Sequence, residues 1–344
     1  MKHFSPLQLQ ILNCLNDGKC HSGSAIGEQL NVSRTAIWKQ INQLVDSGLK
    51  IDRLPQTGYQ LTQPFIPLQE TLIREHLMQS SIDREMDFHL FSEIDSTNRY
   101  LKDLQYAPAV SICCAEKQTQ GRGRFGRHWE SPFGENIYLS SRWELNCCPS
   151  KLSGLSLMIS LSILESLQSN HIHQDIRVKW PNDLIWQDKK LCGILIEVTA
   201  ETNGFAHVII GIGLNVNTAT QHQPLADKPW CSLYELTGMH FDRNKLIANL
   251  LRDLAHNLEK FLQCGFQVFH KRWQDYDYLD GQYITVSQAR GSMSGYASGV
   301  TDQGQLCLID DNGLEHYLSS GDTSLSSINR PGNYAMQDQQ NTKL

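Results

Sequence analysis

Apolar residues at helical spacing open the chain and predict a small helical unit. The three segments with this pattern are residues 7–15, 22–30 and 33–44. Their apolar side chains recur every three or four positions, which is the period of one helix face. Ser33 suits the N-cap of the third helix, because its hydroxyl can accept a backbone hydrogen bond. Strand-like residues 49–54 and 59–61 follow around a Pro-Gln-Thr-Gly turn, so residues 1–64 are expected to form a winged helix-turn-helix.

The third predicted helix carries residue types that contact DNA phosphates and base edges. We expect the DNA-facing residues to be Ser33, Arg34, Thr35, Trp38 and Lys39. Up to residue 64 the chain has six Lys and Arg against four Asp and Glu, a net charge of +2, whereas the whole chain carries −6. The contrast favours DNA binding by this unit. A winged helix that binds only protein is the alternative.

Strand-like and helical segments then alternate, after a linker at residues 63–67 that holds two prolines. The expected strands are residues 86–91, 110–116, 136–143, 176–186 (a strand running into a turn), 191–198 and 205–212, with a hairpin turn at 187–190. The expected helices are residues 68–78, 97–104, 152–167, 247–261 and 267–273. From about Gly281 short strands alternate with glycine turns, which predicts a small β barrel. The polar residues 330–344 are expected to be disordered.

The segment Gln118–Gly134 combines three glycines with three arginines in the run Gly-Arg-Gly-Arg-Phe-Gly-Arg. Glycine lets a ligand approach the main chain, and arginine supplies a permanent charge with a fork of donors. We therefore expect an anionic ligand here, with a basic surface loop as the alternative. The run also matches a dinucleotide fingerprint, but that motif requires a helix to begin inside it. Trp129 and Pro132 precede another strand-like segment, so we reject that interpretation.

Composition limits the location of the protein. Ten cysteines are present without a C-x-x-C pair, and neither a signal peptide nor an apolar run long enough for a bilayer is recognisable among the 344 residues. We expect a cytoplasmic protein with reduced thiols and no membrane partner. His171 and His173 have a metal-like spacing, but no further ligands support a metal site, and we interpret them as surface residues.

Several short motifs occur in an order that resembles the biotin–protein ligases. They are Ser96-Thr97-Asn98, Gln118 with the glycine–arginine run from Gly121 to Arg127, Trp129-x-Ser131-Pro132-x-Gly134, Lys179-Trp180-Pro181-Asn182-Asp183, Lys190-Leu191-x-Gly193-Ile194-Leu195-x-Glu197 and Gly211-Ile212-Gly213-x-Asn215. The amino-terminal winged helix makes the chain similar to the bifunctional form, which is also the biotin operon repressor. The resemblance covers nearly all of residues 1–329.

The resemblance implies an α+β fold with three domains. Residues 1–64 would bind DNA, residues 65–278 would form a mixed sheet with helices like that of class II aminoacyl-tRNA synthetases, and residues 279–329 would form an SH3-like barrel. It also implies two chemical steps. Biotin's carboxylate attacks the α-phosphate of ATP, assisted by Mg²⁺, and a lysine of the biotin carboxyl carrier protein of acetyl-CoA carboxylase then takes the biotinoyl group. Biotinoyl-AMP would promote a homodimer that binds operator DNA.

The resemblance also implies roles for individual residues. The biotin-binding set would be Ser96, Thr97, Asn98, Gln118, Gly121, Arg122, Gly123, Arg124, Lys179 and Gly193. The ATP and adenylate set would be Arg127, Trp129, Asn182 and Asn215. Lys179 and Arg124 would be catalytic, with Lys179 bridging carboxylate and phosphate. Elementary electrostatics supports these roles, because the carboxylate and the phosphate are both anions and need positive charge around them when they meet.

Phe125 departs from the family pattern, since some repressor-type members have arginine there. The change removes a charge and could provide an apolar lid. Three alternatives stay open from the sequence: a lipoate–protein ligase on the same fold, a ligand-sensing transcription factor without catalysis, and a ligase whose winged helix no longer represses.

Overall fold

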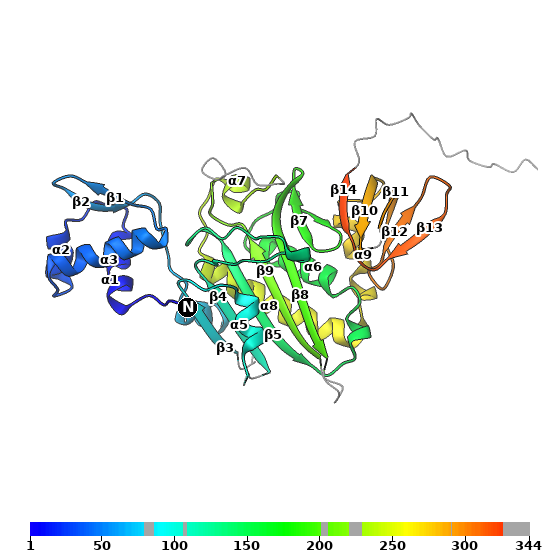
Figure 1. The fold of residues 1–344 in the computed structure, drawn as a ribbon, viewed down its shortest axis with the longest axis horizontal. Coiled ribbons are helices and arrows are strands. Elements are labelled where there is room, and N and C mark those ends of the chain that lie inside the picture. Colours follow the sequence, from blue (N-terminus) through cyan, green and yellow to red (C-terminus); the bar gives the residue numbers. More distant parts are fainter. Residues whose placement is uncertain (79–85, 106–108, 201–205, 220–228, 290, 326–344) are drawn as a thin grey trace, which may run out of the picture.

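The computed structural model describes residues 1–78, 86–105, 109–200, 206–219, 229–289 and 291–325. The expectation of a disordered tail at residues 330–344 falls outside these ranges. Figure 1 shows the amino-terminal unit and the carboxy-terminal sheet on either side of a central sheet with its helices.

The first unit is a three-helix bundle with a β hairpin. Its elements are α1 (Pro6–Leu15), α2 (Gly23–Gln29), α3 (Arg34–Ser47), β1 (Ile51–Leu54) and β2 (Gly58–Leu61). Ser5, Ser22 and Ser33 cap the three helices by accepting backbone hydrogen bonds. The inward residues of the helices form a core of their own. The predicted helix-turn-helix and wing are therefore confirmed.

A seven-stranded mixed sheet forms the centre of the molecule. Its strands are β3 (Asp87–Phe91), β4 (Val110–Ala115), β5 (Ile137–Leu145), β6 (Arg177–Lys179), β7 (Asp183–Trp186), β8 (Lys189–Ala200) and β9 (Ala206–Leu214). They lie in the order β3-β4-β5-β9-β8-β7-β6, and β3–β4 is the parallel pair. Long antiparallel pairings of β9 with β5 and β8 bring segments 137–145, 189–200 and 206–214 side by side.

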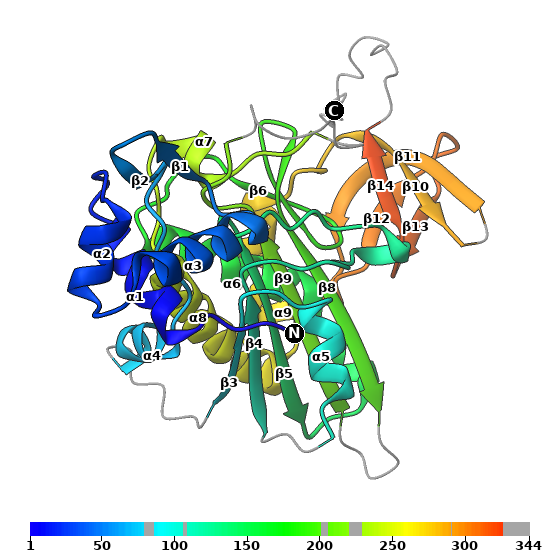
Figure 2. The same cartoon turned by 60° about the vertical axis from the view of Figure 1, so that its left-hand side comes forward.

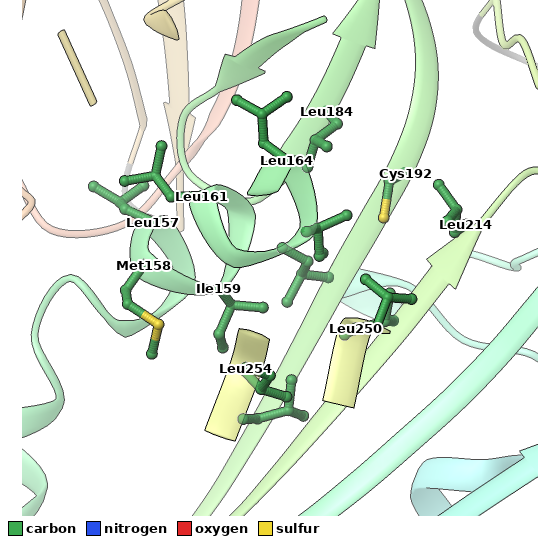
Figure 3. Packing of buried hydrophobic residues seen from close by; sticks show 14 of the residues in the cluster. Leu157, Met158, Ile159, Leu161, Leu164, Leu184, Cys192, Leu214, Leu250 and Leu254 are labelled. Carbon is green, nitrogen blue, oxygen red and sulfur yellow. The ribbon is translucent and has the colours of Figure 1, made fainter. Parts of the chain in front are cut away.

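Helices cover the sheet, as Figure 2 shows. They are α4 (Glu70–Met78), α5 (Thr97–Asp103), α6 (Leu155–Ser169), α7 (Leu233–Thr237), α8 (Arg243–Cys264) and α9 (Gln267–Tyr276). Leucines of α6 and α8 fill the main core against the sheet (Figure 3). Helix α7 is not predicted by the sequence, since its five residues are too few to show a helical period.

The carboxy-terminal strands form a separate five-stranded antiparallel sheet. They are β10 (Tyr283–Gln288), β11 (Gly291–Val300), β12 (Leu306–Ile309), β13 (Glu315–Leu318) and β14 (Asp322–Leu325), in the order β13-β12-β11-β10-β14. Strand β14 was not predicted. The central sheet also corrects the turn expected at residues 187–190, because Lys189 and Lys190 already belong to β8 and only Gln187 and Asp188 turn.

Among the described residues, the amino-terminal unit contacts the central part through residues 133–135 and through the segment just after β3. Lys50 forms an ion pair of 2.8 Å with Glu135, and Phe133 belongs to the core of the winged helix. The rings of Phe4 and Phe65 pack against Phe133 at centroid distances of 6.0 Å. Lys2 exchanges backbone hydrogen bonds with Ser92 and Glu93, just after β3. Residues 133–135, which follow the arginine-rich loop, thus form part of the surface against which this unit packs.

A buried ion pair joins the linker to the central sheet. Arg243, at the start of α8, lies 2.5 Å from the carboxylate of Glu116, and their side chains are 2% and 1% exposed. The same guanidinium donates to the carbonyls of Asn136 and Ile66, and Glu116 accepts the backbone N–H of Leu68. Four segments far apart in sequence therefore meet at this pair.

All ten cysteines lie in described residues and are free thiols. Burial raises the pKa of Cys231 to about 12 and raises the pKa values of Cys113, Cys114 and Cys192 as well, which keeps these thiols protonated and unreactive. Within the described ranges no helix combines the length and apolarity that crossing a membrane requires.

Replacing Glu116 by leucine should destabilise the fold. The charge of Arg243 would stay buried without its partner, which costs about 3–5 kcal/mol of unfolding free energy. Urea unfolding followed by tryptophan fluorescence measures this cost. Glu70→Ala, which removes an exposed pair with Arg74, is the control and should cost less than about 1 kcal/mol. Glu116→Leu/Arg243→Met should recover much of the loss, and a single variant no worse than the control would contradict the assignment.

Candidate active site

A cavity of about 560 Å³ opens on the central sheet, within the size range of small-ligand sites. Most residues expected from the sequence line it: Ser96, Thr97, Asn98, Gln118, Arg122, Gly123, Arg124, Arg127, Trp129, Asn182, Gly193 and Asn215. Gly121 and Lys179 are not among the lining residues. The structure thus brings together side chains from α5, the loop after β4, the turn after β6, and strands β8 and β9.

One end of the cavity is a network of neutral polar groups. Ser96 caps α5, so the helix begins at the cavity wall. The backbone N–H and the hydroxyl of Thr97 both donate to Oε1 of Gln118, at 2.9 and 3.1 Å. Gln118 in turn donates to the Ser131 hydroxyl at 3.3 Å. These bonds fix the Gln118 amide before any ligand arrives.

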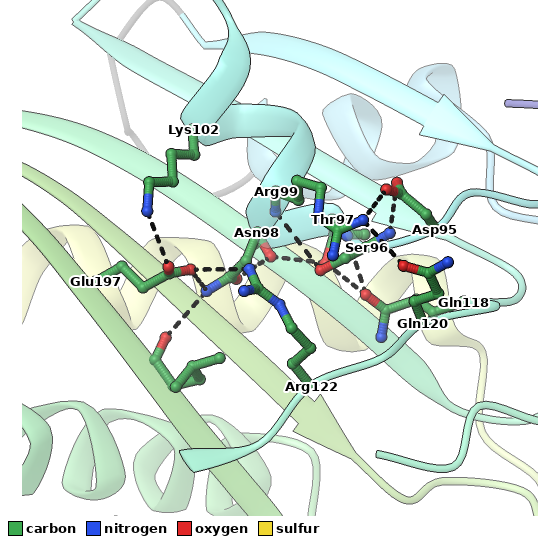
Figure 4. Close-up of polar contacts among 12 residues, drawn as sticks. Asp95, Ser96, Thr97, Asn98, Arg99, Lys102, Gln118, Gln120, Arg122 and Glu197 are labelled. Atoms are coloured by element: carbon green, nitrogen blue, oxygen red, sulfur yellow. Dashed lines mark hydrogen bonds and ion pairs between the residues drawn. The ribbon is translucent and has the colours of Figure 1, made fainter. Parts of the chain in front are cut away.

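Asn98 continues this network and is almost fully buried. Its Oδ1 lies 2.6 Å from the Ser140 hydroxyl, and its Nδ2 donates to Glu197 at 3.0 Å (Figure 4). A Cβ atom at Gly211 would lie 2.3 Å from Oδ1 of Asn98. Glycine on β9 is therefore required for the asparagine to lie against the strand.

The glycine–arginine run forms a small hairpin rather than an open loop. Gly123 donates to the carbonyl of Arg127 and Trp129 to that of Gly121, and residues 122 and 128 form a β-bridge. The tip, Arg124–Gly126, is one 3₁₀ turn, and extended chain follows it. The described structure thus has no α-helix at the place where a dinucleotide fingerprint needs one. Phe125 at the tip has a φ of +57°, and its side chain is 64% exposed.

Each arginine of the hairpin contacts a different element. Arg122 lies 3.5 Å from Glu197 on β8, and Arg124 donates to Oδ1 of Asn182 at 3.2 Å. Arg127 forms an ion pair with Asp322 at the start of β14. Burial lowers the pKa of Arg124 from its ordinary value, and Asp183 and Asp322 oppose that shift. An arginine stays charged under such conditions, so the cavity keeps partly desolvated positive charge.

An indole ring and a lysine form another part of the wall. The Trp129 ring packs directly over Gly213 on β9, where a Cβ atom would lie 2.5 Å from the ring, so glycine is required there. The ammonium group of Lys190 lies 5.4 Å from the centre of that ring and 2.7 Å from Asp183. Nε1 of Trp129 is buried and makes no hydrogen bond within the described structure. A flat aromatic face beside an ammonium group suits a nucleotide.

Some expected residues hold the cavity wall together. Asn182 donates to the carbonyl of Ile194, and Asn215 donates to that of Cys231. Lys179 ends β6 in register with Asp183, which does line the cavity. The carbonyl of Gly121 accepts the backbone N–H of Trp129 at the base of the hairpin.

Other lining residues had been given no role from the sequence. Lys190, Asp183, Gly211 and Gly213 stand inside the recognised motifs, and their spacing within those motifs was the available signal. No sequence pattern indicated Asp322, because it reaches the cavity only through the packing of β14 against the hairpin. The described residues contain no group of three or more potential metal ligands, and His171 and His173 flank the buried Ile172 as exposed residues.

The expected DNA-facing residues lie together on α3. Ser33, Arg34, Thr35, Trp38 and Lys39 are all exposed, and the Trp38 side chain is 51% exposed although it is apolar. The opposite face, with Ile37, Ile41 and Leu44, is buried. The helix therefore presents a continuous polar and aromatic face to solvent.

Comparisons with known proteins agree with both halves of this description. The Biotin/lipoate A/B protein ligase family matches residues 90–215, and an HTH domain matches residues 7–60. The biotin protein ligase of Aquifex aeolicus, solved in complex with biotin and ATP, is 29% identical with a TM-score of 0.60, and the match covers 70% of this chain and 98% of that one.

Full-length relatives carry both functions in their names. The bifunctional ligase/repressor BirA of Escherichia coli is 36% identical over 94% of this chain and 98% of that protein. BirA of Bacillus subtilis is 30% identical over 87% and 92%. The chain therefore belongs to the family of bifunctional biotin ligases and repressors.

Proposed function

We propose that this protein activates biotin with ATP and transfers it to the biotin carboxyl carrier protein of acetyl-CoA carboxylase. A carboxylate oxygen of biotin attacks the α-phosphorus, the bond to the β-phosphate breaks, and pyrophosphate leaves. The amine of a carrier lysine then attacks the acyl carbon of biotinoyl-AMP, and AMP leaves. The observation that carries the proposal is the cavity itself, which pairs a neutral polar end with a wall of arginines.

The polar end and the arginine wall of the cavity suggest separate roles for their residues. Neutral hydrogen-bonding groups from Ser96, Thr97, Asn98 and Gln118 suit the cyclic urea of biotin, while Arg122 and Arg124 close over the ligand. Trp129 offers a face for the adenine ring, with Arg127, Asn182 and Asn215 near the adenylate. Positive charge from the hairpin and Lys190 offsets the repulsion between carboxylate and phosphate. ATP would bring Mg²⁺ on its phosphates, and the ion would add positive charge where carboxylate and phosphate meet.

Incubation with biotin, MgATP and the carrier domain tests the function, with the carrier read by mass. We expect one biotinoyl group on one lysine and none with lipoate. Lys179→Ala should lower adenylate formation by about 10²-fold, the scale for losing one transition-state donor. Lys151→Ala, on an exposed lysine, is the matched control. Lys179 lies outside the cavity lining, so a Lys179→Ala rate equal to the control would move this role to Lys190.

Arg124→Gly should release the reactive intermediate. Biotinoyl-AMP is a mixed anhydride that survives only while water and stray amines are excluded. Arg124 fixes the hairpin tip to Asn182, and glycine there would add backbone freedom. In a mixture of carrier and an unrelated protein, we expect this variant to label both, whereas the wild type labels the carrier. Labelling confined to the carrier, or loss of all labelling, would show that the tip is not the lid.

We also propose that the winged helix represses biotin biosynthesis genes, with biotinoyl-AMP as corepressor and a homodimer as the DNA-binding form. The ordering of the hairpin by ligand lowers the entropy cost of dimerisation. The SH3-like barrel and the domain boundaries at residues 64, 278 and 329 remain part of this proposal. The five-stranded carboxy-terminal sheet supports them.

Operator binding should require both the ligand and the exposed face of α3. With biotin and ATP present, sedimentation should show a dimer and the affinity for biotin-gene promoter DNA should rise. Lys39→Ala should weaken binding and reduce the slope of log K against log salt by about one per removed phosphate contact. Lys271→Ala on α9 is the control. A monomer at all concentrations would exclude this switch, and an unchanged salt slope would remove Lys39 from the DNA contacts.

A further inference from the structure

Glu197 on β8 is an acidic residue in direct contact with the polar end of the cavity. Its Oε2 accepts from Asn98 at 3.0 Å and lies 3.5 Å from Arg122. Its Oε1 lies 3.6 Å from Lys102 on α5 (Figure 4). The Glu197 side chain is 23% exposed, so its charge is only partly screened. The carboxylate therefore lies between α5, whose first residues line the cavity, and the arginine hairpin.

An ionised carboxylate only accepts hydrogen bonds, and this property dictates the orientation of its neighbour. Asn98 must turn its amide nitrogen to Glu197 and its carbonyl oxygen to the hydroxyl of Ser140, which lies 2.6 Å away. Nδ2 of Asn98 is also 3.4 Å from the carbonyl of Leu195, a second acceptor that supports the same orientation. Asn98 is 4% exposed, so these protein groups are the main partners of its amide.

The orientation set by Glu197 extends to the hydroxyl of Ser140. A hydroxyl has one hydrogen, and Ser140 gives it to Oδ1 of Asn98. Ser140 therefore faces the hydroxyl of Thr97, which lies 2.7 Å away, with its lone pairs. Gln118 is oriented separately, because its Oε1 accepts the backbone N–H of Thr97 and its amide nitrogen then donates to Ser131. Glu197 thus sets the donor and acceptor sides of Asn98 and Ser140.

Glu197 also holds the base of the arginine hairpin. Arg122 faces it through a terminal nitrogen, while Nε of Arg122 is buried without a hydrogen bond in the described part of the chain. The ion pair is therefore a main restraint on that guanidinium before ligand binds. Ordering the arginine in advance lowers the entropy cost of closing the hairpin on a ligand.

We propose that Glu197 is the positioning residue of the biotin end, acting through Asn98 and Arg122 without touching the reacting atoms. It fixes which donors and acceptors the cavity offers to a cyclic urea, and it holds Arg122 ready. The inference rests on the proposed function and adds a residue to it. Its effect falls on biotin recognition rather than on ATP or on the chemical steps.

Glu197→Gln tests this role by removing the charge at nearly constant volume. We expect the KM for biotin to rise about tenfold, the scale for losing a hydrogen bond to a charged group. The KM for ATP and the kcat should stay within about twofold, since the residue acts only on the biotin end. Lys102→Gln removes the most exposed neighbour of Glu197, and Glu144→Gln removes an exposed carboxylate from β5; both should leave all three constants unchanged.

A double-mutant cycle separates positioning from a general structural effect. Asn98→Asp places two carboxylates against each other and should weaken biotin binding by about 10²-fold, because like charges at this distance repel. Adding Glu197→Gln to Asn98→Asp should recover at least about tenfold, since an amide can again donate to a carboxylate. Titration calorimetry with biotin alone measures both variants, and melting temperature reports on folding.

The outcomes distinguish this inference from the function on which it rests. A wild-type protein that neither binds biotin nor modifies the carrier would overturn both. A wild type with normal activity together with an unchanged biotin KM in Glu197→Gln would overturn the inference alone. Equal increases in the KM values for biotin and ATP, or additive losses in the double variant, would assign Glu197 a structural role and likewise overturn it.

Discussion

The buried pair of Arg243 and Glu116 fixes both ends of the ligand-binding segment. Glu116 directly follows β4, and Asn136, whose carbonyl accepts from Arg243, directly precedes β5. All residues of the arginine hairpin lie between these two points. A buried charge is tolerated only when its bonds are complete, so the pair restricts the relative positions of β4, β5 and α8. The hairpin is thus a loop with clamped ends, and clamping the ends lowers the entropy that must be lost when it closes.

Within those limits, glycine and arginine have complementary effects. Glycines give the hairpin its close backbone approach, as at Gly121, where a Cβ atom would meet the carbonyl of Trp129 at 2.5 Å. That freedom costs entropy, and the arginines offset it by contacts to three separate elements, β8, the turn at Asn182 and β14. The same three guanidinium groups carry the positive charge that an acyl phosphate needs. The charge that serves the ligand also stabilises the ligand-free arrangement.

Local patterns in the sequence predicted most elements and most of the cavity. Helical spacing and serine caps located α1 to α3, and polar motifs located twelve of the lining residues, because a motif records which residues act together. Contacts between distant segments could not be read in this way. Nothing in the sequence near Asp322 indicates that β14 packs against Arg127, and nothing near Glu197 shows that its carboxylate faces Asn98 rather than solvent. Lys179 is not among the lining residues, and its role stays a prediction, since a motif gives the identity of a residue but not the direction of its side chain.

The winged helix packs against the segment that follows the arginine hairpin. Trp129 lines the cavity, and four residues later Phe133 is buried in the core of the DNA-binding unit, beside Glu135 with its ion pair to Lys50. The chain therefore runs from the ligand cavity to the DNA-binding unit within four residues. Proximity alone does not make a switch, because a ligand shifts an equilibrium only by its difference in affinity for the two states. Residues 129–135 line the cavity at one end and support the winged helix at the other. A difference in ligand affinity between two states can therefore act on both functions through this segment.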